Sequence, residues 1–62
     1  MQDVVFCIAT FRDGTSVRIN ARKIEVYYSD GEGGTIIRTP SDEYYVKESP
    51  EAIDNFLRRY TE

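Results

Sequence analysis

Apolar residues follow two different periods along this chain, and the change of period divides it into two parts. Up to Val46 they recur at every second position, in short runs that turn-forming residues interrupt. After Pro50 they recur at helical spacing. A period of two is typical of strands, and a period near 3.6 is typical of helices. The pattern therefore predicts a β-rich part followed by one C-terminal helix.

The first part of the chain predicts five short strands. Runs of alternating residues cover positions 4–11, 16–20, 24–29, 35–39 and 43–47. Asp13-Gly14, after the first run, is a strong hairpin signal because both residues accept positive φ. We therefore expect an α+β fold, in which a small, curved, antiparallel five-stranded sheet or open barrel is closed by one C-terminal helix.

The helix is expected over residues 50–60. Ser49 suits the N-cap, since its hydroxyl can accept a hydrogen bond from a free N–H of the first turn, and Pro50 suits the first helical position. One stripe of the helix is apolar and consists of Ala52, Ile53, Phe56, Leu57 and Tyr60. We expect the stripe to cover one face of the sheet, with Ile53, Phe56 and Leu57 buried. Residues 1–62 then form a single domain with its strands in 4–47.

Both faces of the first predicted strand are apolar, unlike those of a strand with one wet side. We expect the helix-covered core to take Val4, Phe6, Ile8, Tyr28, Tyr44 and Phe56. One helix covers only one face of a sheet. The uncovered face should then carry the remaining apolar side chains, which are Val5, Cys7, Ala9, Phe11, Tyr27, Ile36 and Tyr45.

An uncovered apolar face usually marks an interface, and tyrosine is enriched at interfaces. The candidate protein-interaction residues are Val5, Phe11, Tyr27, Ile36 and Tyr45. We expect a homo-oligomer, most simply a symmetric dimer that uses the same face of both copies. Two alternatives remain: cross-strand aromatic packing on a wet face, and closure of the sheet into a barrel that buries this face within one chain.

Composition narrows the chemistry of the chain. It has one cysteine and no histidine, which excludes an intrachain disulfide and a histidine-based catalytic triad. Cys7 lies in the most apolar run and is expected to be a small buried hydrophobic residue. The glycine-rich segment 30–34 lacks the lysine of a P-loop and the acid spacing of an EF-hand, which favours a plain hairpin loop. We therefore predict no enzyme activity, no catalytic, cofactor-binding or metal-binding residue, and no cofactor.

The charge balance disfavours nucleic acid as a partner. The chain has 8 basic and 11 acidic residues and a net charge of −3, whereas binding to nucleic acid or anionic lipid depends on basic patches. Arg12, Arg18, Arg22, Lys23 and Arg38 could form such a patch, but acidic residues are interspersed with them. We expect a mixed solvated face, no nucleic-acid partner and no membrane insertion. With no signal peptide or spanning segment visible, we also expect a cytoplasmic protein.

Several segments together resemble the small flagellar FlbD-like family. They are residues 24–28, 35–39 and 44–49, the last with the sequence VKES before the helix, and Ile19-Asn20 before the third strand. The resemblance covers nearly the whole chain and implies a small accessory protein that binds other proteins, with no catalytic residue. The same segments are similar to part of the LytTR-type DNA-binding domain, whose final basic recognition segment has no counterpart here.

These observations predict a small non-enzymatic protein-interaction or accessory module that self-associates. Small proteins of this pattern also occur in mobile elements. One alternative is therefore a phage-encoded inhibitor of a host defence protein, which would act by protein contact. A second alternative is a nucleic-acid-binding module that uses the face of the sheet. The partner protein itself is not predicted.

Overall fold

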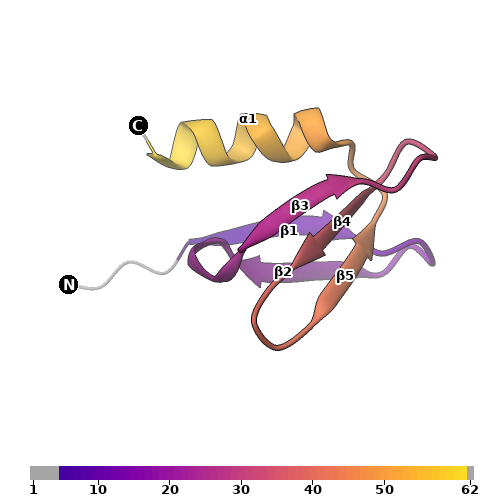
Figure 1. Ribbon diagram of the computed structural model, residues 1–62, viewed down its shortest axis with the longest axis horizontal. Helices are drawn as coiled ribbons and strands as arrows, with labels where there is room; N and C mark the ends of the chain where they lie inside the picture. The colour runs from indigo at the N-terminus through magenta and orange to yellow at the C-terminus, as the bar shows by residue number, and fades with distance from the viewer. Residues whose placement is uncertain (1–4, 62) are drawn as a thin grey trace.

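Two antiparallel sheets and one helix make up the fold (Figure 1). The computed structural model describes residues 5–61. Val4, predicted in the first strand, and the side chain of Tyr60 lie outside the described part. Along the chain the elements are β1 (Phe6–Thr10), β2 (Ser16–Asn20), the 3-10 helix η1 (Ala21–Lys23), β3 (Val26–Ser29), β4 (Thr35–Arg38), β5 (Glu43–Val46) and α1 (Pro50–Thr61).

The strands pair as a hairpin and a three-stranded meander. β1 pairs with β2, and β3, β4 and β5 form a separate sheet in that order. The α+β class and the antiparallel pairing are confirmed, but the expectation of one five-stranded sheet is wrong. β1 meets β5 only at an isolated bridge between Phe11 and Val46. Pairing does not continue beyond it because the chain turns after Lys47 and enters the helix at Pro50.

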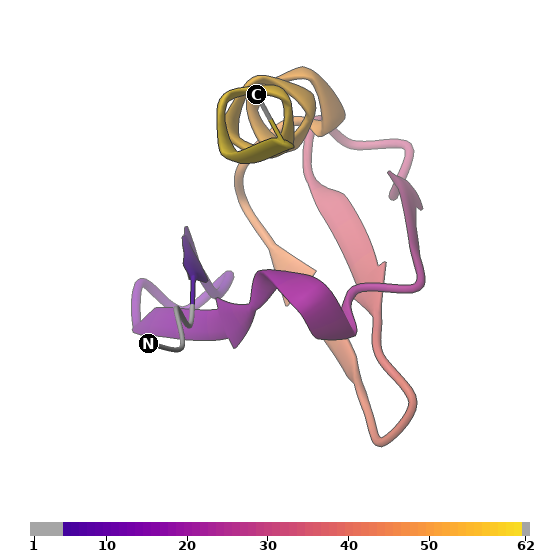
Figure 2. The ribbon, with the colours of Figure 1, turned by 90° about the vertical axis from the view of Figure 1, so that its left-hand side faces the viewer.

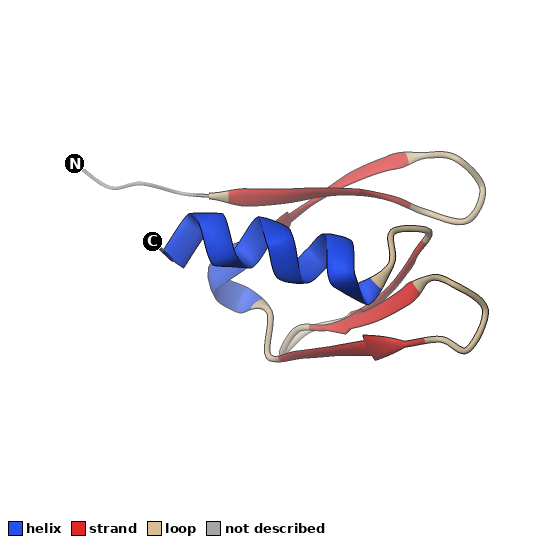
Figure 3. Cartoon of the chain, turned by 90° about the horizontal axis from the view of Figure 1, so that it is seen from above, coloured by secondary structure: helices blue, strands red, loops and turns tan. Residues whose placement is uncertain are grey.

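α1 closes the space between the two sheets. Viewed along the molecule, the β1–β2 hairpin and the three-stranded sheet diverge, and the helix lies over the open side (Figure 2). From above, the helix lies between the hairpin and the three-stranded sheet (Figure 3). Residues from all three parts form one hydrophobic core, which consists of Cys7, Ala9, Ile19, Ile37, Val46 and Ile53.

The start of the helix agrees with the sequence prediction. The Ser49 hydroxyl oxygen accepts a hydrogen bond from the Ala52 N–H at 3.2 Å, so Ser49 is the N-cap. Ile53 is buried, with 2% of its surface exposed. Phe56 and Leu57 are only partly buried and pack against the edge of the core. Ile53 is therefore the main anchor of the helix.

The side chains of β1 point the opposite way from the prediction. Cys7 and Ala9 face inward and are buried. Phe6 and Ile8 face outward and are 46% and 61% exposed. The expected burial of Cys7 is confirmed, but its expected place on an uncovered face is wrong, and so is the burial of Phe6 and Ile8. Because both sets of alternating residues are apolar, polarity could not fix the orientation. The larger side chains took the outer face.

The side chains of β3 are also reversed relative to the prediction. Tyr28 is 44% exposed instead of buried. Tyr27 faces inward, where it packs against the core and its hydroxyl donates a hydrogen bond to the Asp54 carboxylate on α1. This hydrogen bond, with burial as a smaller cause, raises the pKa of Tyr27 to about 12. An inward tyrosine is therefore tolerated because the helix supplies a partner for its hydroxyl.

The role of Ile53 as the anchor of α1 can be tested by truncation. Ile53→Ala should lower the free energy of unfolding by about 2–5 kcal/mol, because it removes a fully buried side chain and leaves a cavity. Asn55→Ala, at an exposed position of the same helix, should change it by less than about 0.5 kcal/mol. Urea unfolding followed by circular dichroism measures both. Equal stability of the two variants would show that the helix does not pack through Ile53.

Candidate protein-interaction surface

A row of apolar side chains crosses the outer face of the three-stranded sheet. The register places Tyr28 of β3 opposite Ile36 of β4, and Ile36 opposite Tyr45 of β5. Tyr28 is 44% exposed and Tyr45 is 45% exposed, with Ile36 partly buried between them. Directly opposed side chains on one face of a sheet are in contact. The three residues therefore form one continuous apolar strip on the surface.

The next row of the same face combines an apolar residue with an ion pair. Val26 lies opposite Arg38, which lies opposite Glu43. Val26 is 44% exposed, and Arg38 Nε lies 3.2 Å from Glu43 Oε2. The Tyr45 hydroxyl donates to Glu43 Oε1 at 3.1 Å, and this bond raises the pKa of Tyr45. The strip is therefore bordered by the Arg38–Glu43 ion pair, in which the two opposite charges cancel.

Arg12 reaches this face from the turn between β1 and β2. Its guanidinium carbon lies 5.6 Å from the centre of the Tyr45 ring, within the range of a cation–π interaction. Its Nη2 donates to Asp30 Oδ2 at 2.6 Å. The Arg12 side chain is 53% exposed while that of Asp30 is 5% exposed. Arg12 is thus fixed at its charged end and still accessible to a partner.

The glycine-rich loop between β3 and β4 holds Asp30 in place. Asp30 Oδ1 accepts hydrogen bonds from the Glu32 N–H at 2.7 Å and the Gly34 N–H at 3.0 Å. The bond from the Glu32 amide, with those from Gly34 and Arg12, holds the pKa of Asp30 below its ordinary value. A Cβ on Gly34 would lie 2.4 Å from the Val46 carbonyl oxygen, so this position requires glycine. The hairpin loop therefore orients the carboxylate that orients Arg12.

We call Arg12, Val26, Tyr28, Ile36 and Tyr45 the tyrosine face. Of the predicted interaction residues, Ile36 and Tyr45 belong to it. The other three lie elsewhere, so their expected place on the same face is wrong. The Phe11 ring stacks with the Tyr44 ring at 6.3 Å on the inner side, and the Tyr27 hydroxyl donates to Asp54. Val5 is partly buried beside η1, where its carbonyl accepts from the Ala21 N–H.

Sequence reasoning missed Arg12, Val26 and Tyr28. The polarity of Glu25 suggested that Tyr27, two positions on, also faces solvent. However, β3 begins at Val26, so Glu25 lies before the strand and says nothing about its faces. A usable signal was the alternation in β4 and β5, where the charged Arg38 and Glu43 mark the outer face and place Ile36 and Tyr45 on it.

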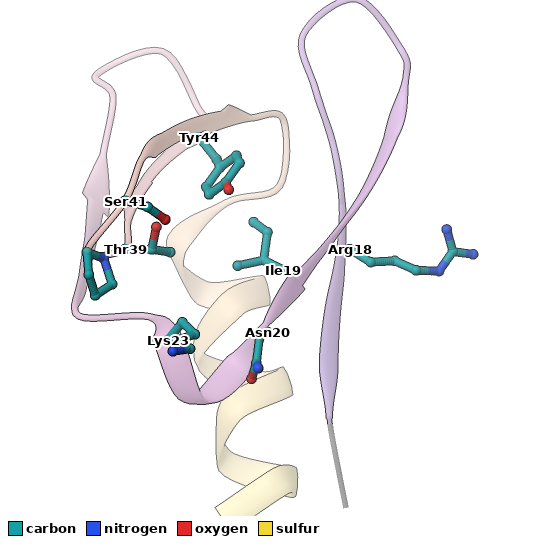
Figure 4. A pocket seen from close by; sticks show the side chains of 8 residues that line it. Arg18, Ile19, Asn20, Lys23, Thr39, Ser41 and Tyr44 are labelled. Carbon is teal, nitrogen blue, oxygen red and sulfur yellow. The ribbon is translucent and has the colours of Figure 1, made fainter.

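A hollow of about 340 Å³ lies on another side of the molecule, between β2 and the turn from β4 to β5 (Figure 4). The residues around it include Ile19, Asn20, Lys23, Thr39, Ser41 and Tyr44. The Arg18 side chain points away from it (Figure 4). The polar groups that line the hollow are an ammonium, an amide and hydroxyls, which could hydrogen-bond a small polar molecule. No carboxylate is among its lining residues, so a pair of acids for catalysis is not assembled there.

Comparison with known proteins gives no match: no family model, no curated protein and no solved structure is similar to the chain. The resemblance to the FlbD-like family therefore stays a prediction. The helix of the described part falls short of the length and apolar character that crossing a membrane requires.

The role of Asp30 gives a prediction about pH. Its pKa is lowered in the folded state, so its contribution to stability is present above the ordinary aspartate pKa and is lost as the pH falls through the folded value. Asp30→Asn should therefore lower stability near pH 7 and flatten the loss of stability that the parent shows as the pH falls from about 5 to about 2. Urea unfolding across this range measures the effect.

Glu32→Gln is the matched control, because Glu32 lies in the same loop and its side chain is exposed. It should leave the pH profile of the parent unchanged. If Asp30→Asn and Glu32→Gln gave the same profile, the Asp30 carboxylate would not anchor the loop and Arg12.

Proposed function

We propose that this protein is a non-enzymatic interaction module that binds another protein through the tyrosine face. The strip of Tyr28, Ile36 and Tyr45, with Arg12 over one end, is the observation that carries the proposal. Tyrosine and arginine are among the residue types most enriched at the positions that dominate binding energy at protein interfaces. Tyrosine offers a large contact area with few rotatable bonds and a polar tip.

The preorganisation of Arg12 supports the same proposal. Ordering a long side chain on binding costs about 0.5–1.5 kcal/mol. Arg12 is already held by Asp30 at 2.6 Å, and Asp30 is held by two loop amides. A partner that approaches the face therefore meets a cation whose position is set before contact.

Nucleic acid is the rival partner for this face. Sheets that bind single strands stack bases on aromatic side chains and attract phosphates with basic ones. Here Arg12 is paired with Asp30 at 2.6 Å and Arg38 with Glu43 at 3.2 Å, and the net charge of the chain is −3. Both features weaken attraction to phosphate, which favours a protein partner.

The biological setting of the partner follows from the resemblance only. A FlbD-like protein would be an accessory factor that contacts other flagellar proteins. A phage-encoded inhibitor would use the same face against a host defence protein. We place the protein in the cytoplasm in either case, because its buried free thiol, Cys7, fits a reducing compartment.

The proposal predicts where cross-linking will occur. A photo-reactive benzoyl-phenylalanine in place of Tyr45 should cross-link a distinct protein in the native cell. The same group in place of the exposed Asn55 on α1 should not. The double variant Tyr28→Ser/Tyr45→Ser, assayed with the captured protein, should bind at least about 30-fold more weakly, as expected for the loss of interface hot spots.

The fold must persist in that double variant for the result to count. Both residues are nearly half exposed, so each substitution should change the free energy of unfolding by less than about 1 kcal/mol. Equal cross-linking from positions 45 and 55 would contradict the proposal. Tight binding of single-stranded oligonucleotides that weakens steeply with salt would instead support the nucleic-acid alternative.

A further inference from the structure

The hollow between β2 and the β4–β5 turn brings together hydrogen-bond donors from four segments of the chain. Asn20 ends β2, Lys23 belongs to η1, Ser41 lies in the turn and Tyr44 belongs to β5. Asn20 and Lys23 lie on one side of the hollow, and Ser41 and Tyr44 lie on the other (Figure 4). Its volume of about 340 Å³ is in the range of sites that hold a small molecule. The hollow can therefore hold a ligand from two sides.

These donors are not used within the part of the chain that the structure describes. There Lys23 has no carboxylate within salt-bridge distance, and the hydroxyls of Ser41 and Tyr44 have no hydrogen bond. Asn20 Oδ1 accepts from the Arg22 N–H at 2.9 Å, which leaves its Nδ2 to donate to a ligand. An ammonium, an amide nitrogen and two hydroxyls are therefore available to one bound molecule.

The charges around the hollow favour an anion. The charged residues that line it are Arg18 and Lys23, both positive. The acids of the adjacent turn and strand are engaged elsewhere. Asp42 Oδ1 accepts from the Glu43 N–H at 3.0 Å, and Glu43 pairs with Arg38 at 3.2 Å on the outer face of the sheet. The hollow is therefore locally positive, although the net charge of the chain is −3.

The side of the hollow that carries the hydroxyls is held in shape by contacts of its own. The Thr39 hydroxyl donates to the Asp42 carbonyl and accepts from the Asp42 N–H, each at 3.1 Å. The Thr39 N–H also donates to the Asp42 carbonyl at 2.9 Å. The Tyr44 ring is fixed by stacking on Phe11 at 6.3 Å. This side is therefore positioned before a ligand arrives, which lowers the entropic cost of binding.

We propose that the hollow binds the phosphoryl group of a small phosphate monoester. A phosphoryl group has three terminal acceptor oxygens, so it can accept from donors that approach from different sides. A carboxylate has two oxygens in one plane and is matched best by the planar fork of an arginine. Here the Arg18 side chain points away (Figure 4), and the cation at the hollow is Lys23, a residue that binds phosphate as a point charge. Pro40 and the Tyr44 ring adjoin the space left for the organic group.

Phenyl phosphate is the probe, and an NMR titration of the isotope-labelled full chain measures its binding. The amide signals of Asn20, Lys23 and Ser41 should shift, with a dissociation constant of about 1 mM or below for a ligand of about ten non-hydrogen atoms. Lys23→Gln should raise that constant at least about tenfold, because it removes a charge-assisted hydrogen bond. Arg18→Gln removes the same charge from a side chain that points away and should change the constant less than about twofold.

A second pair of variants tests the hydroxyl at the hollow. Tyr44→Phe keeps the ring that stacks on Phe11 and should weaken binding at least about threefold, because one hydrogen bond to the phosphoryl group is lost. Tyr45→Phe removes a hydroxyl from the tyrosine face and should leave binding unchanged. The proposal is therefore independent of the function proposed for the tyrosine face.

The pH dependence of binding separates a phosphoryl group from a carboxylate. A phosphate monoester loses its second proton near about pH 6, so phenyl phosphate should bind more tightly as the pH rises from about 5.5 to about 7. The chain has no histidine, and its other ionisable side chains ordinarily titrate outside this range. The change in affinity therefore reports the proton of the ligand. Benzoate keeps a constant charge over this range and should bind more weakly at every pH.

Three results would overturn the proposal. The first is that about 10 mM phenyl phosphate shifts no amide signal at the hollow. The second is that benzoate binds as tightly as phenyl phosphate, which would make the hollow a general carboxylate site. The third is that Lys23→Gln and Arg18→Gln weaken binding equally, which would show attraction to the overall charge and not to the hollow.

Discussion

Glu48 accepts two hydrogen bonds from Thr10, one from the backbone N–H and one from the hydroxyl, each at 2.9 Å. Its own carbonyl accepts from the hydroxyl of the buried Thr35 at 2.6 Å. The next residue, Ser49, caps the helix. The hairpin, the three-stranded sheet and α1 therefore meet at one short segment. Since β1 and β5 share only an isolated bridge, this junction provides much of the polar connection between the two sheets.

The charge of Glu48 is part of this connection. Burial alone would raise its pKa, but hydrogen bonds from the Thr10 N–H, from its own backbone N–H and from the Thr10 hydroxyl, with the nearby charge of Lys47, together outweigh that effect and hold the pKa below its ordinary value. A carboxylate can accept both bonds at once, which an amide or a hydroxyl at this position could not do in the same geometry. The same contact ends the pairing of β1 with β5.

Local signals in the sequence were enough to locate the elements. The observed β2 covers the predicted residues 16–20, and α1 begins at the predicted Pro50. The direction in which each strand's side chains point was harder to predict. β1 is apolar at every position except Thr10, and the polar Glu25 lies just before β3 and not in it. The division into two sheets depends on a bond between residues 38 positions apart, which no local pattern reports. Local alternation was enough to assign Ile36 and Tyr45 to an exposed face. Arg12 reaches that face from a turn distant in the sequence, so no local pattern could place it there.

The pH dependence of unfolding in Glu48→Gln tests the role of this junction most directly. The folded-state pKa of Glu48 is lowered, so its contribution to stability exists above the ordinary glutamate pKa and disappears as the pH falls through the folded value. We expect Glu48→Gln to be less stable than the parent by about 1–3 kcal/mol near pH 7, because it breaks a charge-assisted hydrogen bond. The difference should shrink as the pH falls toward about 3. Glu25→Gln, at an exposed position, should follow the parent throughout. Parallel profiles for Glu48→Gln and the parent, with equal stability near neutral pH, would contradict the account.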